Sequence, residues 1–181
     1  MSRRSTGLLT SNVKERRVLV RGKISRSIAS CSIARLLVLA TDDHRQPIVI
    51  HIDSPGGLAS DSLGVISTIN GIRSPVATFC RGEVGGTAAA IAAHGVKGCR
   101  VAAPGARFSL KLPEVSEGSR HANQESHFRL LVETLSKDTG KPENVVAEWL
   151  ASDAVFGPEE AVARGLVDLV STEPVMPNPV A

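Results

Sequence analysis

The chain has 181 residues, of which 42% are hydrophobic and 22% charged, and its formal net charge is +3. This composition is typical of one globular domain with a hydrophobic core and excludes a disordered chain. No apolar run reaches the roughly 20 residues of a membrane-spanning helix, and no apolar signal segment follows the N-terminus. We therefore expect a cytoplasmic protein that does not associate with a membrane.

Positive charge is concentrated in the N-terminal segment. Residues 1–26 contain eight Lys and Arg but one acid, so the rest of the chain is net acidic. Aromatic residues make up only 3% of the chain, which disfavours a surface that stacks on nucleic-acid bases. We interpret residues 1–16 as a solvated basic arm and expect no nucleic-acid partner.

The cysteines and histidines show no metal-binding pattern. Cys31, Cys80 and Cys99 are widely separated, which indicates reduced thiols buried in the core. The five histidines also lack the spacing of metal ligands. The sequence therefore predicts neither a metal nor another cofactor.

Hydrophobic periodicity predicts alternating strands and helices. In chain order we expect strand 18–20, helix 28–40, strand 48–52, helix 59–72, strand 76–80, helix 86–94, strands 99–103 and 108–112, helices 119–137, 143–150 and 158–164, and strand 166–170. The continuous apolar strands are typical of a sheet buried on both faces, and therefore of an α/β fold. We expect one domain over residues 17–172 and a flexible tail over 173–181.

Two glycine-rich segments follow predicted strands. Asp53–Gly57 comes after one strand, and Gly82–Thr87 is expected to form a turn between the next strand and a helix. Both turns would lie at the carboxyl ends of parallel strands, where α/β folds bind ligands. Their backbone N–H groups could form an oxyanion hole.

Four motifs resemble the ClpP family, the proteolytic subunit of the Clp protease, over residues 11–172. They are Ile52–Gly57, Gly82–Ala89, Ala103–Arg107 and Pro158–Asp168, in that order. The resemblance implies a ClpP/crotonase-like fold of stacked ββα units. It also implies a protruding handle helix at about residues 114–139.

The resemblance implies an incomplete catalytic triad. The positions of the family's serine, histidine and aspartate are occupied by Gly86, Lys111 and Asp153. The matched oxyanion-hole positions are Gly57 and Thr87, whose backbone N–H groups do not depend on the side chain. With the nucleophile and general base absent, we expect Lys111 and Asp153 to form an ion pair.

Other departures from the family pattern concern assembly. The chain between residues 113 and 153 is shorter than in the family by about seven residues, roughly two helical turns. Ser152 stands where the family commonly has an arginine that links two rings, and His51, Gly71 and Arg81 occupy positions that often carry aromatic residues for ATPase docking. The resemblance thus implies lateral association through the head domain, a shortened handle and weakened docking to a Clp-type ATPase.

Three functions are consistent with the sequence. The leading hypothesis is a ClpP-like pseudopeptidase, similar to ClpR-type members, whose partners are Clp peptidase subunits (itself or an active paralogue), with unfolded peptide as a further ligand. The second is a serine-type endopeptidase that uses Ser109, two residues before Lys111, or Thr87. The third is a crotonase-like protein that binds an acyl-CoA through paired backbone N–H groups.

Overall fold

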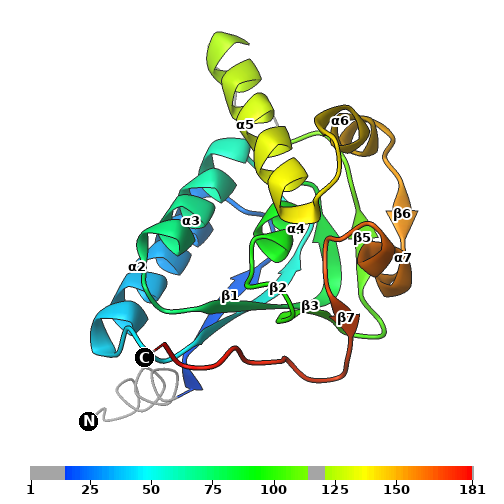
Figure 1. Ribbon diagram of the computed structural model, residues 1–181. Coiled ribbons are helices and arrows are strands. Elements are labelled where there is room, and N and C mark those ends of the chain that lie inside the picture. The colour runs from blue at the N-terminus through cyan, green and yellow to red at the C-terminus, as the bar shows by residue number, and fades with distance from the viewer. Residues whose placement is uncertain (1–14, 114–120, 181) are drawn as a thin grey trace, which may run out of the picture.

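The computed structural model describes residues 15–113 and 121–180, which form an α/β fold (Figure 1). The elements are β1 (Arg17–Arg21), α2 (Arg26–Asp42), β2 (Ile48–Ser54), α3 (Ala59–Gly71), β3 (Val76–Gly85), α4 (Thr87–Ala93), β4 (Arg100–Ala102), β5 (Arg107–Ser109), α5 (His121–Thr139), α6 (Glu143–Ala151), β6 (Val155–Phe156), α7 (Pro158–Ala163) and β7 (Leu169–Val170). The predicted alternation of strands and helices is confirmed. The two-residue strand β6 was not predicted.

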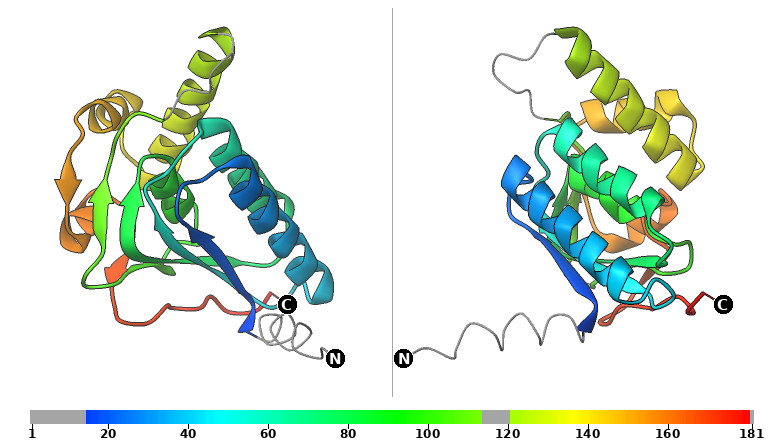
Figure 2. Two further views of the ribbon diagram at one scale, coloured as in Figure 1. Left: turned by 180° about the vertical axis from the view of Figure 1, so that it is seen from behind. Right: turned by 90° about the vertical axis from the view of Figure 1, so that its left-hand side faces the viewer.

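The sheet is mostly parallel. Strands β1, β2, β3, β4 and β7 are neighbours in that order, and all these pairs are parallel. Strand β5 pairs in parallel with the end of β3, and β6 pairs antiparallel with β5. Helices α2, α3 and α4 lie on the same side of the sheet (Figures 1 and 2). The carboxyl ends of β2 and β3 are therefore side by side.

Helix α4 lies at the centre of the core. All seven of its residues are buried, and five of them are alanine, so backbones can pack close to it from several directions. The main hydrophobic cluster fills the space between the helices and the inner face of the sheet. Because all of α4 is buried, the core holds the position of its N-terminal end, where the candidate site lies.

The outer face of the sheet is only partly buried. A smaller cluster there contains Val49, Ala77, Phe79 and Val101, whereas β1 alternates between exposed and buried residues. The prediction of a sheet buried on both faces is therefore correct for the central strands but not for β1. Strand β1 is an edge strand, so its outward side chains have neighbours on one side only.

The second glycine-rich segment differs from the prediction. Strand β3 continues through it to Gly85, because Val84 at its end pairs in register with Phe108 of β5. Gly86 alone connects the end of β3 to the start of α4 at Thr87. The turn expected over Gly82–Thr87 is thus a single-residue junction.

The segment after β7 follows a defined path. It crosses under the sheet (Figures 1 and 2), and the Val180 N–H donates to the carbonyl of Arg45 over 2.9 Å. Ser171, Pro174 and Pro177 are half-buried while the residues between them are exposed. A period of three is that of a polyproline II segment with one edge against the protein. The segment thus has at least one contact with the body of the molecule near its end.

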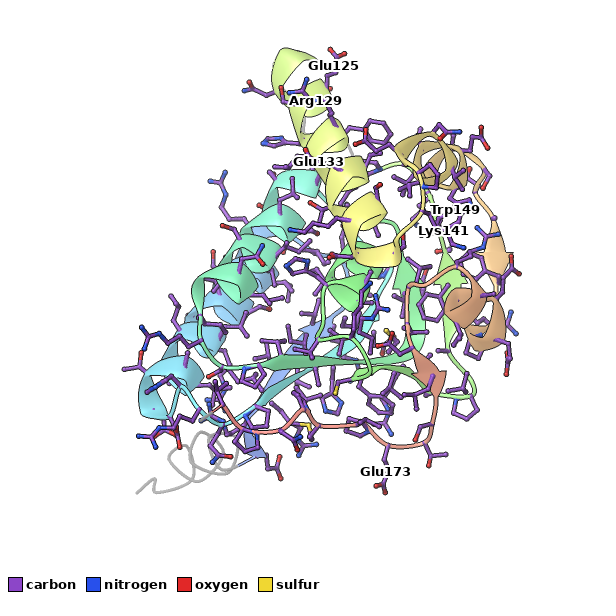
Figure 3. All side chains as sticks on the ribbon, viewed as in Figure 1. Glu125, Arg129, Glu133, Lys141, Trp149 and Glu173 are labelled. Carbon is purple, nitrogen blue, oxygen red and sulfur yellow. The ribbon has the colours of Figure 1, made fainter. Side chains whose placement is uncertain are left out.

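Helix α5 projects from the body of the molecule (Figure 1). Its C-terminal half is anchored by buried Leu131 and Leu135, whereas Glu125 and Arg129 are labelled along the projecting part in Figure 3. The helix is thus docked on the core at its C-terminal end and exposed at its N-terminal end. The start of the proposed handle at residues 114–120 lies outside the described residues.

A buried arginine fastens α5 to the sheet. Arg100 of β4 donates from Nε to the Asp168 carboxylate over 2.9 Å, and its Nη1 donates to the carbonyls of Ala93, Asp138 and Gly165, each over 3.0 Å. Burial by itself would raise the pKa of the Asp168 carboxyl, but the hydrogen bonds from Arg100 outweigh it and lower that pKa. One guanidinium thus connects segments from four parts of the chain.

No helix among the described residues is both long enough and apolar enough to cross a membrane.

Candidate functional site

The centre of the candidate site is the junction between β3 and α4. Gly86 has φ 46° and ψ −118°, a conformation that only glycine adopts without strain. Its N–H donates to the carbonyl of Ser109 over 2.7 Å, which holds the junction against β5. A sharp strand-to-helix turn of this kind is the nucleophile elbow of serine hydrolases. Here the elbow carries no side chain.

The two glycine-rich segments touch each other through their backbones. A Cβ on Gly85 would lie 2.5 Å from the carbonyl oxygen of Pro55, and one on Gly56 would lie 2.5 Å from the carbonyl oxygen of Gly85. Neither residue could carry a side chain unless the backbone moved. The prediction that both segments meet at the carboxyl ends of β2 and β3 is confirmed.

The space beside Gly86 is occupied by Lys111. A Cβ on Gly86 would lie 3.4 Å from the carbonyl oxygen and 3.5 Å from Cγ of Lys111. The remaining cavity has a volume of about 10 Å³, which is room for about one water molecule. It is lined by Pro55, Gly57, Gly86, Thr87, Lys111, Leu112 and Pro113. Four of the five predicted site residues therefore meet in one place.

Asp153, the fifth predicted site residue, does not line this cavity. It is exposed and has a left-handed backbone (φ 48°) in the turn between α6 and β6. The next residue, Ala154, accepts a hydrogen bond from the Leu110 N–H over 3.2 Å, so Asp153 lies beside the strand that leads to Lys111. The described residues nevertheless contain no ion pair between Lys111 and Asp153, so the expected pair is not formed.

One of the two N–H groups expected to form the oxyanion hole, that of Gly57, already donates a hydrogen bond to the Thr87 side chain. The Gly57 N–H donates to Thr87 Oγ1 over 3.1 Å, and the Ser62 hydroxyl donates to the same oxygen over 2.8 Å. All three groups are buried, so water does not compete for these bonds. The Thr87 N–H lies in the first turn of α4, where no intrahelical acceptor exists.

The site therefore differs from the expected pair of free amide donors. Sequence reasoning missed Ser62, although its place on the inward face of the predicted helix 59–72 was a signal for burial.

The substitute nucleophiles are not activated. Ser109 Oγ is buried and has no hydrogen-bond partner among the described residues, so no bond joins it to Lys111. The Thr87 hydroxyl is fully buried and already accepts two hydrogen bonds. A nucleophilic hydroxyl needs a base within hydrogen-bond reach. Neither residue meets this requirement.

A histidine–carboxylate pair lies at the other end of α4. His94 Nδ1 is 2.6 Å from Asp138 Oδ2, and its Nε2 is 3.0 Å from Asn70 Oδ1. The pair connects α3, α4 and α5. Both ring nitrogens are thus used in contacts that hold the helices together.

No group of three or more His, Cys, Asp or Glu side chains in residues 15–113 and 121–180 is close enough to hold a metal ion. The thiols are distributed differently from the prediction. Cys80 and Cys99 are buried as expected, but Cys31 is exposed on α2. Burial raises the pKa of the Cys80 thiol, which keeps it protonated.

Comparison with family models identifies this architecture. The model described as Clp protease matches residues 2–174. The match includes both glycine-rich segments, the junction at Gly86, and the positions of Lys111 and Asp153. It therefore covers all of the candidate site.

Proposed function

Because the chain belongs to the Clp protease family, we propose that it is a ClpP-like pseudopeptidase that acts as a non-catalytic ring subunit or regulator of a Clp protease. The observation that carries the proposal is the β3–α4 junction. Gly86 keeps the backbone of a nucleophile elbow but offers no nucleophile, and Lys111 lies against it at the position of the family's histidine.

The size of the expected defect is large. In comparable triad enzymes, removal of the nucleophile alone lowers kcat by about 10⁶-fold. The residual catalysis in such variants comes mainly from the oxyanion hole. In this chain the Gly57 N–H already bonds to Thr87, so that contribution is reduced as well. Peptide hydrolysis by the family mechanism is therefore not expected.

Neither alternative function is favoured by the site. Ser109 has no base beside its hydroxyl, which gives the unusual serine peptidase no support. The acyl-CoA hypothesis needs two free N–H donors and room for a thioester, whereas the cavity measures about 10 Å³. The geometry thus favours a protein whose role lies in assembly.

The surface offers a place for lateral association. Leu19 on the edge strand β1 is 65% exposed, and Leu37 and Val38 on the neighbouring helix α2 are 49% and 53% exposed. Exposed apolar side chains on adjacent elements are typical of an interaction surface. We assign these exposed apolar side chains to contacts with other Clp peptidase subunits, either copies of this chain or an active paralogue. Weak docking of a Clp-type ATPase and binding of unfolded peptide belong to the same proposal.

Two experiments test the proposal together. The full chain is treated with a serine-directed phosphonate and with fluorogenic peptides, using a serine-containing ClpP as the positive control. It is also purified from its own cells and examined by native mass spectrometry. We expect no labelling, no hydrolysis, and mixed rings with a serine-containing subunit. Stoichiometric labelling of Ser109 or Thr87 would instead establish a peptidase.

A lone monomer in the native mass spectrum, with no co-purifying subunit, would remove the assembly role.

A further inference from the structure

A pocket much larger than the cavity at Gly86 lies between the edge strand β1 and helix α2. Its volume is about 350 Å³, which is within the range of pockets that bind small molecules. It shares no residue with the cavity at Gly86, so the proposed pseudopeptidase site does not account for it. The pocket is lined by Arg17, Val18, Leu19, Cys31, Ser32 and Arg35.

The reactive group of this pocket is the thiol of Cys31. Cys31 is exposed on α2, whereas Cys80 and Cys99 are buried. Exchange between a thiol and a disulfide requires that the disulfide can reach the thiol. Cys31 is therefore the thiol that a small disulfide can reach while the chain is folded.

A positioned arginine accompanies the thiol. Arg35 follows Cys31 by four residues, which places both side chains on one face of α2. Its Nε donates to the carbonyl of Arg17 over 3.3 Å, and this bond ties the guanidinium to the edge strand. Its Nη2 is buried and has no hydrogen-bond partner among the described residues. A buried polar atom without a partner is costly, so this donor points to an acceptor that a ligand supplies.

Arg35 also lacks a carboxylate to balance its charge. In the part of the chain that the structure describes, Arg35 forms no ion pair, whereas the neighbouring Arg17 is paired with Glu15. A guanidinium can bind a carboxylate through two parallel hydrogen bonds. A ligand that carries a carboxylate would therefore satisfy both the charge and the unused donor of Arg35.

We propose that Cys31 is a site of reversible S-thiolation by a small thiol that carries a carboxylate, for which glutathione is the probe. The Cys31 thiolate attacks one sulfur of the low-molecular-weight disulfide. A new S–S bond forms at Cys31 Sγ while the S–S bond of the disulfide breaks, and the other half leaves as a thiolate that takes up a proton. Cys31 is oxidised, and the departing half of the disulfide is reduced. The carboxylate of the bound half accepts hydrogen bonds from Arg35.

The inference does not depend on whether the chain has peptidase activity. Leu19 in this pocket is also among the side chains assigned above to subunit contacts. The test therefore uses the full chain purified by itself, where no other subunit covers the pocket.

The test compares rates of disulfide exchange at Cys31, followed by peptide mass mapping. The reduced chain is mixed with oxidised glutathione, and the matched control is the same disulfide with its carboxylates esterified. Each rate is divided by the rate at Cys31 in the chain unfolded in urea, which removes the intrinsic difference between the two disulfides. We expect one glutathionyl group per folded chain and a normalised rate at least about tenfold higher for the free acid than for the ester, as for a charge-assisted contact.

Variants assign this preference to the pocket. Cys31→Ser should remove the modification, because the other two thiols are buried. Arg35→Gln should lower the preference for the free acid to about that of the unfolded chain. Arg26→Gln changes an exposed arginine on another face of α2 and should leave the preference unchanged. Circular dichroism checks that each variant folds. Arg35→Lys, which cannot form two parallel hydrogen bonds, serves if Arg35→Gln does not fold, and it should also lower the preference.

Three results would overturn the proposal. The first is an equal normalised rate for the free acid and the ester. The second is the same loss of preference in Arg26→Gln and Arg35→Gln, which would indicate a diffuse charge effect. The third is a disulfide between two chains as the main product at Cys31, which would make the thiol part of a contact between copies.

Discussion

Introducing a serine at Gly86 tests the interpretation of the β3–α4 junction as an empty nucleophile elbow. Gly86→Ser adds the side chain that the family mechanism requires. The structure predicts that this chain is accommodated, because the nearest atoms to a Cβ are 3.4 and 3.5 Å away and belong to Lys111. The cost is therefore backbone strain at φ 46° rather than a steric clash.

Strain of this kind costs about 1–3 kcal/mol. For a domain of this size each kcal/mol lowers Tm by about 2–4 °C, so Gly86→Ser should lower Tm by about 2–12 °C. Gly98→Ser is the matched control, since Gly98 has φ 86° and a Cβ there would have no atom within 4 Å. The two variants should lose similar amounts. Gly85→Ala should lose more, because its Cβ would lie 2.5 Å from the Pro55 carbonyl oxygen.

The assays are urea and thermal unfolding, phosphonate labelling and hydrolysis of a fluorogenic peptide. We expect Gly86→Ser to fold and to show no hydrolysis above the wild-type background, because no histidine is among the described residues that line the cavity at Gly86 and the Gly57 N–H is bonded to Thr87. A much larger loss of stability than in Gly98→Ser would refute the steric argument. Rapid hydrolysis by Gly86→Ser would show that the rest of the site is competent, with Lys111 as the base.

Three further predictions concern the core and the thiols. Thr87→Val leaves two buried donors without an acceptor and should destabilise the protein by about 2–6 kcal/mol in urea unfolding. Thr134→Val removes a solvent-exposed hydrogen bond to the Leu130 carbonyl from a half-buried position on α5 and should change stability little. Equal effects of the two substitutions would contradict the proposed role of the Thr87 hydrogen bonds. The pKa of Asp168 is lowered in the folded protein, so the stability it contributes is present at neutral pH and is lost as the pH falls below about 3.9 through the folded pKa. Asp168→Asn should therefore reduce the loss of unfolding free energy that the wild-type protein shows as the pH falls into the acid range. An unchanged pH dependence of the unfolding free energy would contradict the lowered pKa of Asp168. Cys31 should react with a thiol reagent in the native state while the two buried thiols react only after unfolding, whereas three fast thiols would disprove the burial of Cys80 and Cys99.

Local patterns were sufficient for most of the secondary structure, whereas the candidate site residues came from the resemblance of four motifs to the ClpP family. Apolar runs such as Ile48–Ile52 and Val76–Cys80 become central strands, because burial of continuous apolar side chains requires a sheet covered on both sides. The glycine-rich segments were recognisable because close backbone approach excludes other residues there. The presence of glycine at position 86 and lysine at position 111 is also read from the sequence alone. These residue types argue against the family's serine mechanism.

The features that the sequence did not predict depend on contacts between segments that are far apart in the chain. Strand β3 extends to Gly85, where β5 pairs with it, and the C-terminal segment returns to the other end of the fold, where the Val180 N–H donates to the carbonyl of Arg45. The Gly57 N–H donates to Thr87, 30 residues away, and Cγ of Lys111 lies 3.5 Å from where a Cβ on Gly86 would be. Periodicity reports which face of an element is buried, but not which partner a donor finds. That choice depends on side-chain positions in three dimensions, which the sheet and helix packing set.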